Sequence, residues 1–393
     1  MIQDFSWQEQ ALLAWQQNNH NGTVKAATGT GKTLFAIKCI KSFQTKPSVL
    51  IVVPTIALCQ QWKQDLIAEG CPESLVGTVG DGKNEFDKKY VVGVINSVRD
   101  NIFLNKDFLI LDECHKALST KNIKVLKRKF KYLLALSATP ERDDLKHNSL
   151  LALAPLVFNY GLDDGIQDNI LSKYKLINIK VSLSWEELKL HQEIDGKVRD
   201  GMVKFGGFDA VKRSCYRGNI EASEVLKLIQ RRRQLLLSCA NKPRQVLDII
   251  KSESSVHTGL PKTIVFCEYI ETAETIKDLL QENSIKTAIY HSKLKTKERA
   301  GLLESYRNGD VPVLVSVKCL DEGLNVPLTE IGIITGGTST RRQAVQRIGR
   351  ILRGLEDKTS KLYQLYVPGS KDYEWCLKRT QELQQSAEEV TWV

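Results

Sequence analysis

The sequence lacks several features that would place it in a specialised class of protein. Its longest apolar runs, such as 48–53, have the length of a strand and fall far short of the roughly 20 residues of a membrane-spanning helix. Its nine cysteines include no Cys-x-x-Cys pair, so neither a zinc site nor a disulfide framework is indicated. No basic stretch followed by an apolar one opens the chain, and no secretory signal is expected. These absences favour an intracellular protein with reduced thiols.

The composition is that of an ordinary globular protein, with 42% hydrophobic and 26% charged residues. A length of 393 residues predicts two or three domains. The net charge of +10 permits a polyanionic partner without proving one. Twelve basic but only four acidic residues lie between Lys197 and Arg244, so much of the positive charge is concentrated there.

Short apolar runs alternate with helical patterns at both ends of the chain, which is typical of parallel sheets covered by helices on both faces. In the first part, strands are expected at 22–26, 48–53, 90–95, 107–112 and 131–137, with helices at 32–43 and 56–69. In the last part, strands are expected at 262–266, 285–290, 311–316, 330–335 and 362–367, with helices at 270–282, 296–307 and 341–350.

The middle of the chain is different, because the pattern from Ser184 to Ser252 is helical almost throughout. The sequence therefore predicts an α/β fold with a helical insertion between or within two parallel-sheet domains. The expected parts are a first domain at 1–160, a connector strand with the basic helical insertion at 161–255, and a second domain at 256–393.

A glycine-rich segment, Ala26–Thr33 (AATGTGKT), follows a predicted strand and opens a predicted helix, which is the context of a phosphate-binding loop. Glycines let backbone N–H groups curl around phosphate oxygens, and the helix amino terminus adds positive potential. Lys32 can reach the β- and γ-phosphates, and the Thr33 hydroxyl can bind Mg²⁺. The remaining residues expected around the phosphates are Thr28, Gly29, Thr30 and Gly31.

A second segment, Leu109–His115 (LILDECH), is an apolar strand that ends in two adjacent acids. Asp112 would hold Mg²⁺ through water, and Glu113 would orient and deprotonate an attacking water. A lone Asp-Glu pair after a strand is often a solvated turn. Its place about 80 residues after the phosphate loop favours a hydrolytic site.

The DECH segment resembles the DExH box of superfamily 2 helicases and translocases, and segments that resemble the family's other motifs follow in order. They are Trp7-Gln8 (glutamine motif), 53–55 (VPT) with Gln61-Trp62 (motif Ia), 137–140 (SATP, motif III), 265–267 (VFC, motif IV), 320–327 (LDEGLNVP, motif V) and 343–353 (QAVQRIGRILR, motif VI). The chain is identified as a member of this superfamily, most similar to XPB-type and phage branch-migration DNA helicases. The resemblance implies two RecA-like domains in tandem, with ATP and Mg²⁺ as ligands.

The resemblance implies roles for residues of the first domain. Gln8 would pair with the adenine edge; the alternative is an exposed glutamine at a helix start. Ser137, Thr139 and His115 would couple magnesium chemistry to domain movement; for Ser137 and Thr139 the alternative is a capped turn.

The resemblance also implies roles in motifs V and VI. Residues of motif V that would contact the nucleotide are Glu322, Gly323 and Asn325, the last of which is aspartate in many relatives. Arg347, Arg350 and Arg353 are spaced three apart on a helical pattern and share one face. In the family, arginines that match Arg350 and Arg353 reach the γ-phosphate across an interdomain cleft. Gln346 would lie near the attacking water or the γ-phosphate.

Two regions are candidates for contact with nucleic acid. Pro54, Thr55 and Ser97 stand where the family contacts phosphates, and such contacts position a strand without reading its sequence. The basic stretch 121–131 is more often a solvated face. In the insertion, Phe205 or Phe208 could stack on a base at the point of strand separation, with Arg231 and Arg232 gripping DNA. Alternatively, the phenylalanines pack the helices together and Arg231–Arg233 face water.

The expected function is an ATP-dependent DNA helicase or translocase that unwinds or remodels branched DNA, such as forks and junctions, with 3′-to-5′ movement implied by the resemblance. The alternatives are a duplex translocase that does not separate strands, an RNA helicase, and an inactive nucleic-acid-binding clamp. A monomer without a membrane partner is expected, located in the cytoplasm, at the nucleoid or in the host of a phage. Loader, recombination, repair or replication proteins are possible partners.

Overall fold

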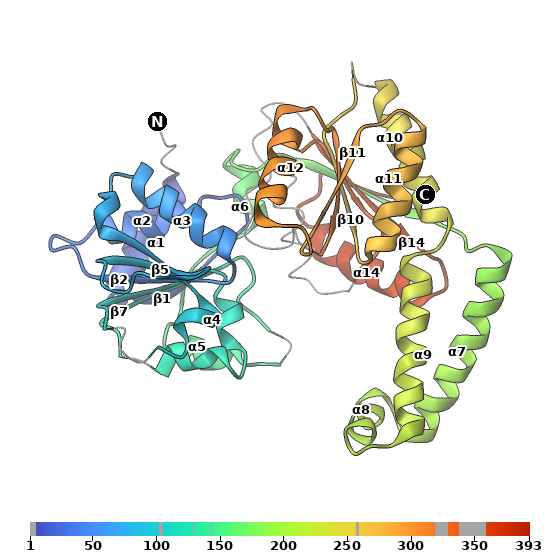
Figure 1. Cartoon of the computed structure of the whole chain (residues 1–393), viewed down its shortest axis with the longest axis horizontal. Coiled ribbons are helices and arrows are strands. Elements are labelled where there is room, and N and C mark those ends of the chain that lie inside the picture. The colour runs from blue at the N-terminus through green and yellow to red at the C-terminus, as the bar shows by residue number, and fades with distance from the viewer. Residues whose placement is uncertain are drawn as a thin grey trace. The chain divides into compact units, whose positions relative to one another are not determined.

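The computed structural model describes residues 5–101, 105–127, 129–142, 144–256, 259–318, 329–337 and 359–393. These residues form two compact units, one that ends at Ser172 and one that begins at Lys173 (Figure 1). Among the described residues, no helix is both long and apolar enough to cross a membrane.

The first unit contains an eight-stranded sheet with the order β4-β3-β5-β2-β6-β7-β1-β8. All its pairs are parallel except the short antiparallel pair of β3 and β4. The strands are β1 (Asn21–Ala26), β2 (Val49–Val53), β3 (Val76–Gly80), β4 (Lys83–Asn84), β5 (Tyr90–Val94), β6 (Phe108–Leu111), β7 (Tyr132–Ser137) and β8 (Leu156–Tyr160). The helices are α1 (Ser6–Gln17), α2 (Lys32–Lys41), α3 (Ile56–Ala68), α4 (Ile95–Val98), α5 (His147–Leu151) and α6 (Leu162–Gln167), with 3₁₀ helices η1 (Glu73–Leu75), η2 (Cys114–Leu118) and η3 (Asn122–Lys127).

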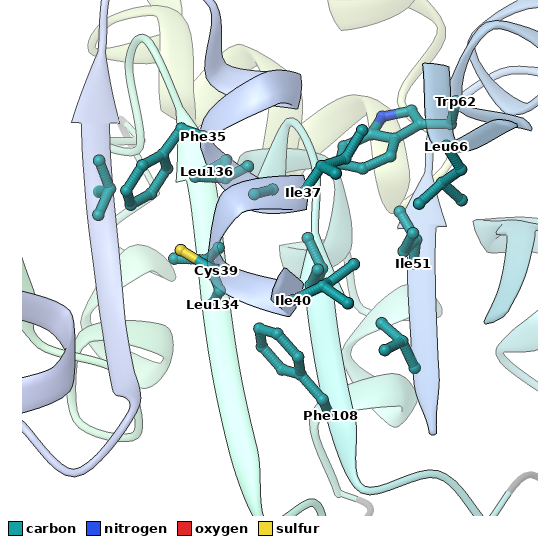
Figure 2. Packing of buried hydrophobic residues seen from close by; sticks show 14 of the residues in the cluster. Phe35, Ile37, Cys39, Ile40, Ile51, Trp62, Leu66, Phe108, Leu134 and Leu136 are labelled. Carbon is teal, nitrogen blue, oxygen red and sulfur yellow. The ribbon is translucent and has the colours of Figure 1, made fainter. Parts of the chain in front are cut away.

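The central strands of this sheet are buried on both faces, and their sequences are therefore almost continuously apolar. Along β2, Val49, Ile51 and Val53 belong to one hydrophobic cluster, whereas Leu50 and Val52 belong to the cluster on the other face. Figure 2 shows the first cluster, in which apolar side chains of α2 pack against β2, β6 and β7. This continuous burial explains why the sequence predicted these strands within one or two residues.

The second unit contains a parallel seven-stranded sheet with the order β11-β12-β10-β13-β14-β9-β15. The strands are β9 (Tyr174–Lys180), β10 (Thr263–Cys267), β11 (Thr287–His291), β12 (Val313–Val317), β13 (Ile331–Ile334), β14 (Ser360–Tyr366) and β15 (Glu389–Trp392). The helices outside the insertion are α10 (Asn241–Val256), α11 (Ile270–Glu282), α12 (Thr296–Asn308) and α14 (Lys371–Leu383). The chain is thus an α/β protein with two parallel-sheet domains, as expected.

The helical insertion lies inside the second unit, between β9 and β10. It consists of α7 (Trp185–Phe205), α8 (Phe208–Tyr216) and α9 (Ile220–Leu237). Helix α10, which the expected insertion also included, packs instead into the core of the second unit. Figure 1 shows α7 and α9 running side by side away from the sheet, with α8 at their far end. The helices are close because Gly201 has no side chain: a Cβ there would lie 2.5 Å from Val225 Cγ2. We call α7, α8 and α9 the arm.

The observed units divide the chain differently from the expected parts at 1–160, 161–255 and 256–393. Helix α6 belongs to the first unit, which continues to Ser172. Strand β9 is not part of a separate connector, because it pairs with β14 on one side and with β15 on the other. Pairing with strands that lie about 200 residues later cannot be read from the local pattern around β9.

Candidate active site

The carboxyl edge of the first sheet collects most residues that the sequence singled out. Strands β5, β2, β6, β7 and β1 are neighbours and parallel, so the segments that follow them meet at one edge. In this order the edge presents Ser97, Thr55, Asp112, Ser137 and the phosphate loop. Open α/β sheets bind ligands at this edge.

The phosphate loop has the backbone shape that its glycines permit. Gly29 and Gly31 have φ angles of +95° and +89°, a left-handed conformation that costs glycine little. The Lys32 ammonium group donates hydrogen bonds to the carbonyl oxygens of Ala26 and Ala27, at 3.1 and 3.2 Å. The Thr28 hydroxyl is buried and lacks a hydrogen-bond partner among the described residues. An unsatisfied buried hydroxyl beside a lysine and a helix amino terminus fits a loop that receives phosphate.

Helix α1 supports this loop through the two residues of the glutamine motif. Gln8 is buried, and its side-chain amide donates to the Gly31 carbonyl oxygen at 3.3 Å. The Trp7 indole donates to the Thr30 carbonyl oxygen at 3.2 Å, and its ring stacks on Tyr160 with centroids 5.0 Å apart. Gln8 is therefore not an exposed helix-start residue, and it lies within contact of the loop.

Asp112 and Glu113 follow β6 directly and are buried at the edge of the sheet. The Asp112 carboxylate accepts from the Trp62 indole at 2.8 Å and from the Glu113 backbone N–H at 2.9 Å. Burial raises the pKa of Asp112, although the Trp62 bond and the charge of Lys32 act in the opposite direction. Glu113 has a φ of +48°, which is uncommon for a residue with a side chain and is concentrated at functional sites.

The predicted coupling residues are in contact with each other and with Glu113. His115 Nδ1 lies 3.5 Å from the Glu113 carboxylate and 3.1 Å from the Ser137 hydroxyl oxygen. That oxygen also accepts from the Thr139 backbone N–H at 3.1 Å. Arg142 donates from Nη1 to the His115 carbonyl oxygen at 2.8 Å. The side chains of Glu113, His115 and Ser137 and the backbone of Thr139 thus form one network at the ends of β6 and β7.

The predicted strand contacts occupy the next two strands along the same edge. Thr55 is the N-cap of α3, where its hydroxyl oxygen accepts from the Leu58 backbone N–H at 3.3 Å. A hydroxyl that accepts in this way still has its own hydrogen to donate. Pro54 precedes the cap directly, and Ser97 is exposed on α4 after β5.

The two phenylalanines of the arm lie in different environments. Phe205 is half-buried and packs against the small apolar core of the arm, which includes Val211 and Val225. Phe208 is 42% exposed, with the Lys212 ammonium group 4.1 Å from its ring centroid. Phe205 therefore packs the helices together, which was the alternative to stacking on a base, whereas Phe208 lies on the surface. Arg231 is exposed, whereas Arg232 forms an ion pair with Asp195.

Three features escaped the sequence analysis. Tyr216 at the end of α8 is 90% exposed, more than either phenylalanine. The contact of Trp62 with Asp112 joins residues 50 positions apart, and no local pattern indicates it. Arg142 lies two residues after motif III, but nothing in the sequence links it to His115.

The basic stretch 121–131 lies partly on the surface. Its Lys124 forms an ion pair with Asp100 there, as expected of a solvated face.

The residues singled out in motifs V and VI lie outside the described residues. They are Glu322, Gly323, Asn325, Gln346, Arg347, Arg350 and Arg353. Among the residues described, no group of three or more acidic, histidine or cysteine side chains is arranged to hold a metal ion. Mg²⁺ bound with a nucleotide does not need such a group, because it keeps several waters and takes other ligands from phosphates. Thr33 in the first turn of α2 and the Asp112 carboxylate are the chain's candidates for this role.

A parallel α/β sheet with a phosphate loop after β1 and an Asp-Glu pair after β6 defines a P-loop nucleoside triphosphatase. Residues 1–142 match the type III restriction enzyme res subunit family, and residues 241–354 match the helicase conserved C-terminal domain. The chain belongs to the superfamily 2 helicases and hydrolyses ATP.

Similar proteins extend over most of the chain. The DNA 3'-5' translocase XPB2 of Sulfurisphaera tokodaii is 29% identical over 384 residues, which cover 95% of this chain and 83% of the relative. Putative helicase 22 of Sulfolobus islandicus filamentous virus is 24% identical over 375 residues, covering 90% of this chain and 62% of the relative. The helicase domain of Pyrococcus furiosus Hef shares the fold, with a TM-score of 0.63 at 17% identity over 94% of this chain and 97% of that structure. Both parallel-sheet domains are therefore RecA-like.

Proposed function

We propose that this chain is an ATP-dependent DNA helicase or translocase that moves 3′ to 5′ and remodels branched DNA. The observation that carries the proposal is the order of residues along one sheet edge, where the hydrolytic residues adjoin the positions expected to contact a strand. DNA as the substrate and the direction of movement are supported by the similarity to the DNA 3'-5' translocase XPB2.

The described residues suggest how hydrolysis proceeds. Bound Mg²⁺ would neutralise charge on the phosphates. Lys32 would exchange its two carbonyl contacts for phosphate oxygens, and Thr28 would gain the partner that it lacks. Glu113 would take the proton of the attacking water. In the family, residues that match Arg350 and Arg353 add positive charge at the γ-phosphate.

The network of Glu113, His115, Ser137 and Thr139 would transmit the state of the nucleotide. The Glu113 carboxylate is a contact of His115, so a change at this carboxylate would reach the imidazole. His115 in turn contacts the Ser137 hydroxyl oxygen, which also accepts from the backbone N–H of Thr139. On the other side of Asp112, Thr55 and Ser97 would hold strand phosphates. Repeated gripping and release would advance the strand.

The preference for branched DNA depends on the arm. Its far end carries exposed Phe208 and Tyr216 together with Lys212, Arg213 and Arg217. Aromatic side chains with basic neighbours are suited to unstacked bases beside phosphates, as found where strands separate. A plain duplex offers no such bases, so a translocase that leaves strands paired would not need this end of the arm.

ATP turnover with single-stranded DNA, duplex, fork, four-way junction and RNA at equal nucleotide concentration tests the proposal. We expect forks and junctions to stimulate most, and Glu113→Gln to bind ATP without turnover. Stimulation by plain duplex alone would favour a translocase without strand separation, and stimulation by RNA alone would favour an RNA helicase. Absence of turnover with every substrate would favour a binding clamp and refute the proposal. Mass measurement in solution tests the expected monomer.

A further inference from the structure

The Asp112 carboxylate has a neighbour whose role the proposed function does not explain. Trp62 in α3 donates its indole N–H to Asp112 Oδ2 at 2.8 Å, and both side chains are buried. The Glu113 backbone N–H donates to the other carboxylate oxygen at 2.9 Å. One donor on each oxygen fixes the plane of the carboxylate, and lone pairs remain for a metal ion or its water ligands.

This indole differs from the other two fully buried indoles of the first unit. Trp7 and Trp15 donate to the backbone carbonyl oxygens of Thr30 and Leu133. Trp62, by contrast, donates to an ionisable side chain, and hydrogen bonds to an ionised group are roughly twice as strong as neutral ones. Packing alone requires only an aromatic ring at this place, beside Leu66 in the cluster of Figure 2.

Helix α3 connects this indole with the expected strand contact. Thr55 caps the helix, and Trp62 lies seven residues later, two turns along the same face and about 10 Å away. Leu58, Cys59 and Leu66 are buried and fix the helix against the sheet. A hydrogen-bonded helix of 13 residues does not bend easily, so a displacement at its cap moves the indole as well.

We propose that Trp62 is a positioning residue that holds Asp112 in the orientation needed for Mg²⁺, and that α3 transmits strand binding at Thr55 to this carboxylate. The second part rests on the proposed function, because it requires a strand at Thr55. The inference explains why an indole, rather than a ring without a donor, occupies this place in the core.

The test is Trp62→Phe, which keeps a ring in the core and removes the donor. Loss of partners that orient metal ligands typically costs 10- to 100-fold in metal affinity. We expect Mn²⁺ to bind at least roughly tenfold more weakly to the ADP complex, measured by electron paramagnetic resonance. ADP affinity without metal should stay unchanged, and the Mg²⁺ concentration for half-maximal ATP turnover should rise in parallel. Single-stranded DNA should tighten Mn²⁺ binding in the wild type but not in the variant.

Trp15→Phe is the matched control, because it removes a buried indole bond that ends on a backbone carbonyl. Equal Mn²⁺ affinity in Trp62→Phe, Trp15→Phe and the wild type would refute the positioning role. A full effect of DNA on Mn²⁺ binding in Trp62→Phe would refute transmission through α3. If nucleic acids leave wild-type turnover unchanged, the proposed function fails, whereas the Mn²⁺ measurement without DNA still decides the role of Trp62.

If Trp62→Phe does not fold, the inference can still be tested by a direct measurement on the wild type. The ¹⁵N–¹H signal of the Trp62 indole can be assigned through its change in Asp112→Asn. We expect this signal to shift when Mg²⁺ joins the ADP complex, because the metal draws electron density from the acceptor. A signal that does not move would overturn the inference.

Discussion

Replacement by alanine should have different effects at Tyr216 and at Phe205, the two aromatic residues of the arm that differ most in exposure. Tyr216 is 90% exposed at the end of α8, whereas Phe205 packs into the arm's apolar core. Tyr216→Ala should therefore leave the fold intact and weaken the binding of forked DNA. Phe205→Ala should destabilise the arm itself, and any loss of binding should follow from that.

The magnitudes follow from these environments. Stacking of a base on an aromatic side chain contributes about 1–3 kcal/mol, so Tyr216→Ala should weaken fork binding roughly 5- to 150-fold. Full burial of a phenylalanine makes its replacement by alanine cost about 3–5 kcal/mol. Phe205 is only half-buried, and we expect a loss of about 2 kcal/mol in arm stability.

Fluorescence anisotropy with a labelled fork and thermal unfolding followed by circular dichroism measure the two effects. Tyr216→Phe is the matched control, because it keeps the ring and should keep most of the affinity. ATP turnover without DNA should be unchanged in all Tyr216 variants. Wild-type fork affinity in Tyr216→Ala, or weak fork binding by a Phe205→Ala protein of unchanged stability, would refute this assignment.

Two further predictions concern stability. Lys242 and Asp372 form an ion pair of 2.7 Å with both side chains fully buried, so Lys242→Met should leave a buried carboxylate without its cation and cost about 3–5 kcal/mol in urea unfolding; a loss below 1 kcal/mol would show that the pair is dispensable. Hydrogen bonds from the Thr78 backbone N–H and hydroxyl hold the pKa of Glu85 below its usual value. The ionised form therefore stabilises the fold above the ordinary glutamate pKa of about 4.3, and this contribution is lost as the pH falls through the lowered value. Glu85→Gln should be less stable than the wild type at pH 7 and equal to it in strong acid, by urea unfolding at each pH; a constant difference would contradict the ionic origin.

The sequence predicted most interior strands of both sheets well, for a physical reason. Strands covered by helices on both faces must be apolar at every position, and such runs stand out against the amphipathic helices between them. β3, β8 and β15 did not stand out, and β9 was expected only as a connector strand. β3 carries two glycines, and β8 and β15 are edge strands that are largely exposed or half-buried. β9 alternates buried and half-exposed residues and depends on partners far along the chain.

The sequence by itself predicted the chemistry of the site, because phosphate binding and water activation need particular residue types at short, fixed spacings. The phosphate loop and the Asp112-Glu113 pair are local motifs of this kind. Only the tertiary structure decided what surrounds them. The bond from Trp62 to Asp112, the network around His115 and the burial of Phe205 depend on packing between elements. No local pattern encodes which side chain a fold brings within 3 Å of another.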